Sequence, residues 1–277
     1  MLSEVVEEIL QSVERLRPMP TSVTRILKEL ESEGVGAATI AEYVGLDQAL
    51  AALVLQMANS ASMGYARTCS SLKEAVVRIG FKRLRSLLLV SPSVNSMKGS
   101  LRGYRLGAGD LWNHSLFTAM AAESLAAILN DEDPEQAYVA GLLHDLGKLL
   151  LDQYVLSDYG KIVEFIQHYR LPLSTVEEKL IGIDHARVGA LIGERWQFPP
   201  ELVSAIRYHH NPPAARHGAR LAAIVNLANV IVIRQYHAQS GLFDDSLHPE
   251  TLAILNLDAG RVEVVSSRVI RRMEQMA

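Results

Sequence analysis

Six residues spread between positions 114 and 210 could together hold a metal ion. Five of the nine histidines stand at or near the ends of expected helices, and one aspartate accompanies them: His114, His144, Asp145, His185, His209 and His210. Imidazole nitrogens with a carboxylate suit zinc, iron, manganese and nickel, and a carboxylate can bridge two ions. Because a pair of ions activates water and holds a phosphate group, these residue types predict a metal centre suited to phosphoester chemistry.

The same histidines also have a simpler interpretation. A single histidine is more often a hydrogen-bonded core or surface residue than a metal ligand. We keep that interpretation for the four histidines outside the set, which are His168, His217, His237 and His248. A metal-free scaffold, in which the remaining histidines bind one another, stays open beside the metal centre.

The pair His144-Asp145 stands inside an otherwise apolar stretch that runs from Gly141 to Leu151. Burying an ionised side chain without a partner costs several kcal/mol, so the pair needs counter-charges or a metal. We expect a helix that begins at Asp133, with Pro134 at its first helical position, and that continues through the pair.

Composition and periodicity predict an all-α fold. The chain has 277 residues, of which 49% are hydrophobic, 21% charged and 6% aromatic. Apolar residues recur at helical spacing, Asp47 is an expected N-cap, and Ser174 and Glu177 have the spacing of a capping box. The glycine-rich residues 96–109 are expected to link a helical bundle at 1–100 to a second bundle at 108–277 packed against it. A single compact unit is the alternative.

Charge and cysteine content exclude several classes of protein. A net charge of −4 and a pI near 6.1 disfavour nucleic-acid binding, and the basic run around Arg83 is expected to be a solvated helix face. The single Cys69 excludes an internal disulfide and a cysteine-based zinc site. The N-terminus is unlike a secretory signal, and the longest apolar run, near 84–90, is far shorter than the ~20 residues of a membrane span. We expect a cytoplasmic protein without a membrane segment.

The order of these residues resembles a known superfamily. His114, His144-Asp145 followed by Gly147-Lys148, Asp184-His185 with Gly189, and His209-His210 resemble the HD superfamily of metal-dependent phosphohydrolases, especially its HD-GYP branch. The preceding half, with Asp47, Met57-Ala58-Asn59-Ser60-Ala61, the run from Ser70 to Val76, and Ile79-Gly80, is similar to the N-terminal region of HDOD proteins. The whole chain resembles a stand-alone HDOD protein, with an N-terminal helical bundle and an HD-type bundle.

The resemblance implies a division of the ligands. His114, His144 and Asp145 would hold one ion, and Asp145 would bridge to a second ion held by the remaining three histidines. Asp145 and Lys148 would be the catalytic residues, with Lys148 near the substrate phosphate or paired with a carboxylate. An ordinary exposed or salt-bridged lysine is the alternative for Lys148.

Two positions depart from the pattern. Asn229 stands where the HD pattern closes with an aspartate, and it would offer a weaker carbonyl oxygen as a ligand. Asn211-Pro212-Pro213 replaces the glycine-tyrosine-proline signature, which argues against cyclic dinucleotide hydrolysis.

The resemblance implies a bacterial signalling or regulatory protein. HDOD proteins as a group resemble HD enzymes that have lost catalytic residues, so we expect one or two divalent transition-metal ions (Fe, Mn, Ni or Zn) and protein partners in signalling. The alternative is a metal-dependent phosphodiesterase or phosphatase that acts on a nucleotide or another phosphoester.

Overall fold

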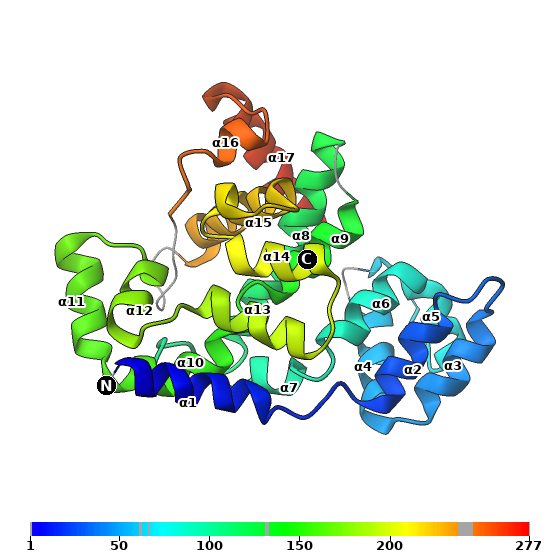
Figure 1. Cartoon of the computed structure of the whole chain (residues 1–277). Helices are drawn as coiled ribbons and strands as arrows, with labels where there is room; N and C mark the ends of the chain where they lie inside the picture. The colour runs from blue at the N-terminus through cyan, green and yellow to red at the C-terminus, as the bar shows by residue number, and fades with distance from the viewer. Residues whose placement is uncertain (1, 61–62, 66, 131–132, 238–245, 277) are drawn as a thin grey trace. The chain divides into compact units, whose positions relative to one another are not determined.

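The chain folds into helices joined by turns and by longer connections such as residues 98–109 (Figure 1). The computed structural model describes residues 2–60, 63–65, 67–130, 133–237 and 246–276. Within these ranges, extended backbone pairs only in an isolated antiparallel bridge between Leu101 and Leu106. The predicted all-α fold is confirmed.

The chain divides into two compact units. The larger unit joins Met1–Leu16 to Asn95–Ile270, and the smaller unit joins Arg17–Val94 to Arg271–Ala277. The larger unit contains the predicted ligands and is built on these helices: α1 (Leu2–Glu14), α8 (Asp110–Leu129), α9 (Pro134–Leu143), α10 (Lys148–Ser157), α11 (Tyr159–Tyr169), α12 (Leu173–Ile181), α13 (His185–Arg195), α14 (Pro200–Tyr208), η2 (Pro212–Ala214), α15 (Ala219–Val232), η3 (Ile233–His237), α16 (Thr251–Ile254) and the start of α17 (Ala259–Met276). The four-residue α7 (Val94–Met97) stands at the boundary.

The smaller unit follows local rules of helix capping. Its helices are α2 (Thr21–Glu29), α3 (Ala37–Gly45), α4 (Gln48–Ala58), α5 (Leu72–Ile79) and α6 (Phe81–Val90). Asp47 caps α4 as predicted, because its Oδ1 accepts a hydrogen bond from the Leu50 amide at 3.1 Å. At the other end of α4, the Asn59 side chain binds both backbone groups of Cys69, at 2.8 and 2.9 Å. These bonds join the end of α4 to the segment that precedes α5, where Cys69 is buried.

The core of the larger unit lies where α8, α9 and α15 pack together. Gly141 lets α9 approach α8 closely, since a Cβ atom there would lie 2.8 Å from the Ala119 Cα and from the Thr118 carbonyl oxygen. This contact places His114 of α8 opposite His144, with ring centroids 5.3 Å apart.

The helix predicted to continue through the His-Asp pair ends before it. α9 does begin at Pro134, with Asp133 as its cap, but it ends at Leu143 with His144 at its C-cap. The His144 Nδ1 binds the Gly141 carbonyl oxygen at 2.7 Å, and the next turn is tightened by bonds from Leu146 to Leu143 and from Lys148 to Asp145. The pair therefore lies in a turn between α9 and α10.

A second glycine fixes this turn against α13. A Cβ atom on Gly147 would lie 2.6 Å from the Gly189 amide nitrogen and would also overlap the His185 carbonyl. Because both backbones have a glycine at this contact, the turn that carries Asp145 lies directly against the start of α13. Packing thus sets the distance between Asp145 and His185.

None of the described helices combines enough length with enough apolar character to cross a membrane.

Candidate metal centre

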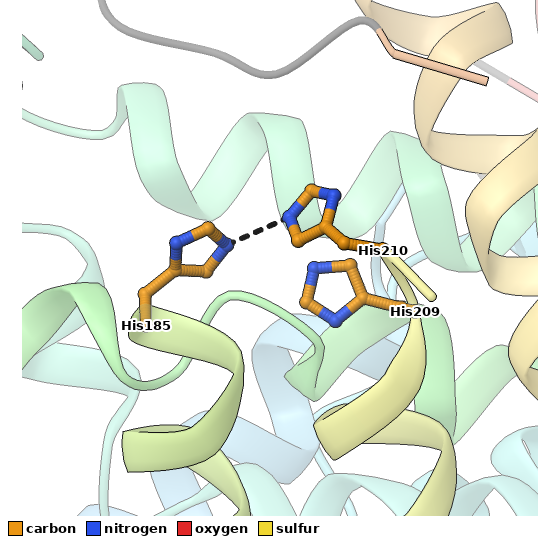
Figure 2. Close-up of side chains that lie close together, drawn as sticks. All are labelled: His185, His209 and His210. Atoms are coloured by element: carbon orange, nitrogen blue, oxygen red, sulfur yellow. Dashed lines mark hydrogen bonds between the residues drawn. The ribbon is translucent and has the colours of Figure 1, made fainter. Parts of the chain in front are cut away.

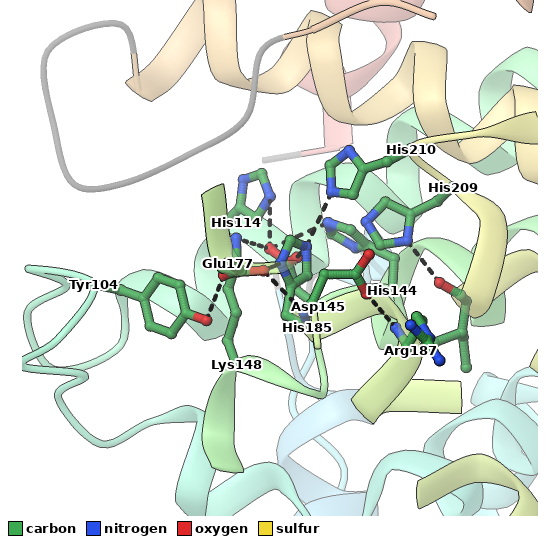
Figure 3. A network of polar contacts seen from close by, with 12 residues as sticks. Tyr104, His114, His144, Asp145, Lys148, Glu177, His185, Arg187, His209 and His210 are labelled. Carbon is green, nitrogen blue, oxygen red and sulfur yellow. Dashed lines mark hydrogen bonds and ion pairs between the residues drawn. The ribbon is translucent and has the colours of Figure 1, made fainter. Parts of the chain in front are cut away.

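The six predicted ligands lie together inside the larger unit (Figure 3), and we call them the His/Asp cluster. They come from three helices and one turn: His114 from near the start of α8, His144 and Asp145 from the turn after α9, His185 from the first position of α13, and His209 and His210 from directly after the last residue of α14. Five of the six side chains are buried, with exposures of 0–1%, and His210 is half-buried. Helix ends and one turn therefore place these six polar side chains together within the larger unit.

The first group contains His114, His144 and Asp145. One ligand atom from each lies within 4.8 Å of the others. The Asp145 Oδ2 is 3.4 Å from the His114 Nε2 and 3.3 Å from the His144 Nε2. These three atoms converge as ligands of a single ion would.

The second group contains His185, His209 and His210 (Figure 2), again with ligand atoms within 4.8 Å of one another. The Nε2 atoms of His185 and His210 face each other at 3.0 Å. The other oxygen of Asp145, Oδ1, lies 3.2 Å from the His185 Nε2. Asp145 thus turns one oxygen toward each group, which is how a carboxylate bridges two ions.

Backbone carbonyls orient two of the histidine rings. The Nδ1 atoms of His144 and His209 lie 2.7 Å and 2.8 Å from the carbonyl oxygens of Gly141 and Ile206. A carbonyl only accepts hydrogen bonds, so each Nδ1 carries a proton and each Nε2 points into the cluster. When such a ring is neutral, its Nε2 offers a lone pair to a cation. Both Nε2 atoms are buried. The His144 Nε2 lies 3.3 Å from the Asp145 Oδ2, and the His209 Nε2 has no hydrogen-bond partner among the described residues. Buried acceptor atoms without donors are what a bound cation would satisfy, so the residues fit a transition metal.

The charge states of the cluster also suit a cation. Burial raises the pKa of the Asp145 carboxyl, but His144 and Lys148 outweigh burial and hold this pKa well below its usual value, so Asp145 is an anion. Burial, with a smaller effect of neighbouring imidazoles, holds the pKa of His209 and His210 well below the usual value. These two rings are therefore neutral and able to bind metal.

His185 is held between two carboxylates. Burial lowers its pKa, but Glu177, together with the hydrogen bond to Asp145, raises the pKa to about 10. In the metal-free protein this ring is a cation, and a divalent ion at its Nε2 would replace a proton in a place that already attracts positive charge.

Lys148 is buried and salt-bridged. Its Nζ lies 2.7 Å from the Asp145 Oδ2, its side chain is 2% exposed, and its ammonium lies 5.5 Å from the centroid of the Tyr104 ring. Both sequence-based interpretations of Lys148 allow this salt bridge, so its catalytic role stays a prediction.

Asn229 is 3% exposed on α15, the helix that packs against α8, α9 and α14. Its role as a weaker ligand stays a prediction. Outside the cluster, His168 and His217 are exposed, in keeping with their interpretation as surface residues.

Glu177 is a site residue that the sequence pattern misassigned. The predicted capping box of Ser174 and Glu177 is wrong, because the N-cap of α12 is Pro172, two residues before Ser174, and it makes no side-chain cap bond. Glu177 is instead fully buried, and its Oε2 binds both the ring Nδ1 and the backbone amide of His185, at 2.6 and 2.9 Å. A carboxylate on the apolar face of a helix was the signal that could have revealed it.

Tyr104 is a second residue that sequence reasoning missed. It lies in the glycine-rich segment expected to be a linker, but that segment is packed, and its hydroxyl donates to the Glu177 Oε1 at 2.7 Å. The Asp152 Oδ1 accepts from the amides of Gly103 and Tyr104, at 2.7 and 3.3 Å, and holds the segment on α10. A chain of buried contacts thus runs from Tyr104 through Glu177 to His185 (Figure 3).

Known proteins resemble this chain over much of its length. The family model described as HDOD domain matches residues 16–212. The chain belongs to the HDOD family. This HDOD chain matches an HDOD domain protein with unknown function from Geobacter sulfurreducens, whose crystal structure has a TM-score of 0.76 and 26% identity over 99% of this chain and 95% of that one.

Two curated relatives are longer than this HDOD chain. An uncharacterized protein of Treponema pallidum (strain Nichols) is 26% identical over 243 residues, which are 83% of this chain and 44% of that protein. Ribonuclease Y of Petrotoga mobilis (strain DSM 10674 / SJ95) is 32% identical over 142 residues, which are 50% of this chain and 20% of that enzyme. The HDOD chain therefore spans less than half the length of the curated relatives it matches.

Proposed function

We propose that this HDOD chain is a bacterial-type regulatory module that binds one or two divalent transition-metal ions (Fe, Mn, Ni or Zn) in its His/Asp cluster. The observation that carries the proposal is the position of Asp145, which turns one oxygen toward each of two groups of histidines. Two orienting carbonyls and the anionic carboxylate add support. A regulatory role implies protein partners in signalling, and the single cysteine favours a cytoplasmic location.

A bound divalent ion would supply Lewis acidity to a phosphoester oxygen. The residues of this chain define where that chemistry could occur. His144 and His209 present oriented Nε2 atoms, Asp145 supplies the negative charge, and the half-buried His210 is the member of the cluster nearest to solvent by exposure. A phosphate-bearing ligand would therefore be expected to enter beside His210.

Metal content is expected to depend on histidines from both groups. Untagged wild-type protein should retain one or two ions per chain by elemental analysis, and the double variant H144A/H209A should retain none, since each group loses an oriented Nε2 atom. The matched control is H168A/H217A, which removes two exposed histidines and should leave the metal content unchanged. Equal metal content in the two double variants, or no metal in the wild type under any supplied ion, would refute the proposal.

The second candidate is a metal-dependent phosphohydrolase that acts on a nucleotide or another phosphoester. It is favoured by the shared Asp145, because a two-ion site clamps both oxygens of a displacement at phosphorus. The similarity of half of the chain to ribonuclease Y also supports phosphodiester chemistry. Turnover of nucleotide or generic phosphoesters with Mn, Fe or Ni that disappears in D145A would support the enzyme. If metal-loaded wild type shows no turnover, the enzyme is excluded and the metal-binding regulatory module is the remaining candidate.

A further inference from the structure

We propose that the two groups of the His/Asp cluster are not equivalent. The second group (His185, His209 and His210) binds one ion tightly, and the Lys148 ammonium takes the place of a second cation beside the first group (His114, His144 and Asp145). This inference rests on the proposed function, because it concerns which part of the cluster a metal ion occupies.

A positive charge, the Lys148 ammonium, already lies beside the first group. The Lys148 Nζ is 2.7 Å from the Asp145 Oδ2, the same oxygen that faces His114 and His144. The lysine is buried, so water screens its charge poorly. An ion held by this group would share its only carboxylate oxygen with an ammonium a few ångströms away, and the two cations would repel each other.

The electrostatic environment of the second group differs, because Lys148 binds the other oxygen of Asp145. This group faces the Asp145 Oδ1, 3.2 Å from the His185 Nε2, and this oxygen is not the one bound to Lys148. Behind His185, the Glu177 carboxylate lies 2.6 Å from the Nδ1, so the ring has an acceptor that fixes its orientation and strengthens its Nε2 as a ligand. An ion in this group therefore has a carboxylate on one side and a carboxylate-supported imidazole on the other.

Tyr104 contacts both Lys148 and Glu177, the two residues that make the groups different. Its ring lies beside the Lys148 ammonium, and its hydroxyl donates to the Glu177 Oε1 at 2.7 Å. Asp152, on the same helix as Lys148, holds the backbone of Tyr104 in place. Since these residues are held by several buried contacts, the placement of the lysine and of Glu177 is built into the fold.

The experiment is a titration of metal-free protein with Co²⁺, followed by the visible absorption of the bound ion and by elemental analysis. Wild type is expected to bind one Co²⁺ tightly and a second at least ~10-fold more weakly. K148M removes the ammonium but keeps the length of the side chain, and it should strengthen the second binding step by about 10-fold or more. E177Q should weaken the tight step by about 10- to 100-fold and change its spectrum, as loss of a supporting carboxylate does.

A matched control is available on α11. Lys161 forms the same i,i+3 pair with Asp158, also at 2.7 Å, but its side chain is 67% exposed. K161M should leave both binding steps unchanged. Single variants then place the tight ion without altering Lys148: H210A should lose it, whereas H114A should keep it. Circular dichroism of each variant verifies that it is folded.

The outcomes separate the inference from the proposed function. Two equal binding steps in wild type that K148M does not alter, or a tight ion lost in H114A and kept in H210A, would overturn the inference while metal binding stands. No Co²⁺ binding in folded wild type or K148M would overturn the proposed function and the inference with it.

Discussion

Replacing Asp145 with asparagine is expected to lower the free energy of unfolding of the metal-free protein by about 3–5 kcal/mol. Asparagine keeps the shape of the side chain but removes the negative charge beside Lys148, which is 2% exposed and lies 2.7 Å away. The lysine would then be a buried cation that has lost its carboxylate. Urea unfolding of metal-free wild type and D145N, followed by circular dichroism, measures the difference.

A double-mutant cycle tests the physical reason for this loss. If the cost comes from the lysine charge, D145N/K148M should recover most of the stability lost in D145N, because removing both members of a buried ion pair is far less costly than removing one. The exposed pair of Asp158 and Lys161 is the control, and D158N should cost less than about 1 kcal/mol. A double variant as unstable as the sum of its single variants would contradict this explanation.

The sequence was sufficient to predict the family, the helical fold and the six clustered residues. Helical periodicity is a local property, and the six clustered residues were found because their order along the chain resembles a known pattern. Local helix-capping rules were sufficient at Asp47, since its predicted cap on α4 is observed. Which oxygen of Asp145 faces which group could not be predicted, because it depends on the contact between Gly147 and Gly189.

The errors arose where a side-chain hydrogen bond, local or distant, decided the local structure. The helix after Asp133 ends early because the His144 ring occupies the Gly141 carbonyl, an arrangement that apolar periodicity does not encode. Glu177 has the spacing of a capping-box residue, but His185, eight positions later, is its partner. Tyr104 lies among glycines typical of a linker, yet Asp152, 48 residues away, fixes it in the core. Sequence spacing therefore identified the clustered residues more readily than the residues that orient them.

Removal of bound metal is expected to have the second large effect. A ligand that binds only the folded state stabilises it by about 4 kcal/mol when its free concentration is 1,000 times its Kd. For a unit of this size, ~4 kcal/mol corresponds to a change of roughly 8–16 °C in the unfolding midpoint. Chelation should therefore lower the midpoint of the larger unit by about this amount, and return of excess ion should restore it, because six ligand atoms are gathered only in the folded chain.

The variant H144A/H209A separates this effect from non-specific binding. It should have nearly the same unfolding midpoint with chelator and with added ion, since one oriented ligand is missing from each group. The exposed-histidine control H168A/H217A should respond to chelation as wild type does. If wild type and H144A/H209A shift equally, the ions act on surface groups or on the unfolded chain rather than on the His/Asp cluster, because the cluster is the part of the larger unit that the double variant alters.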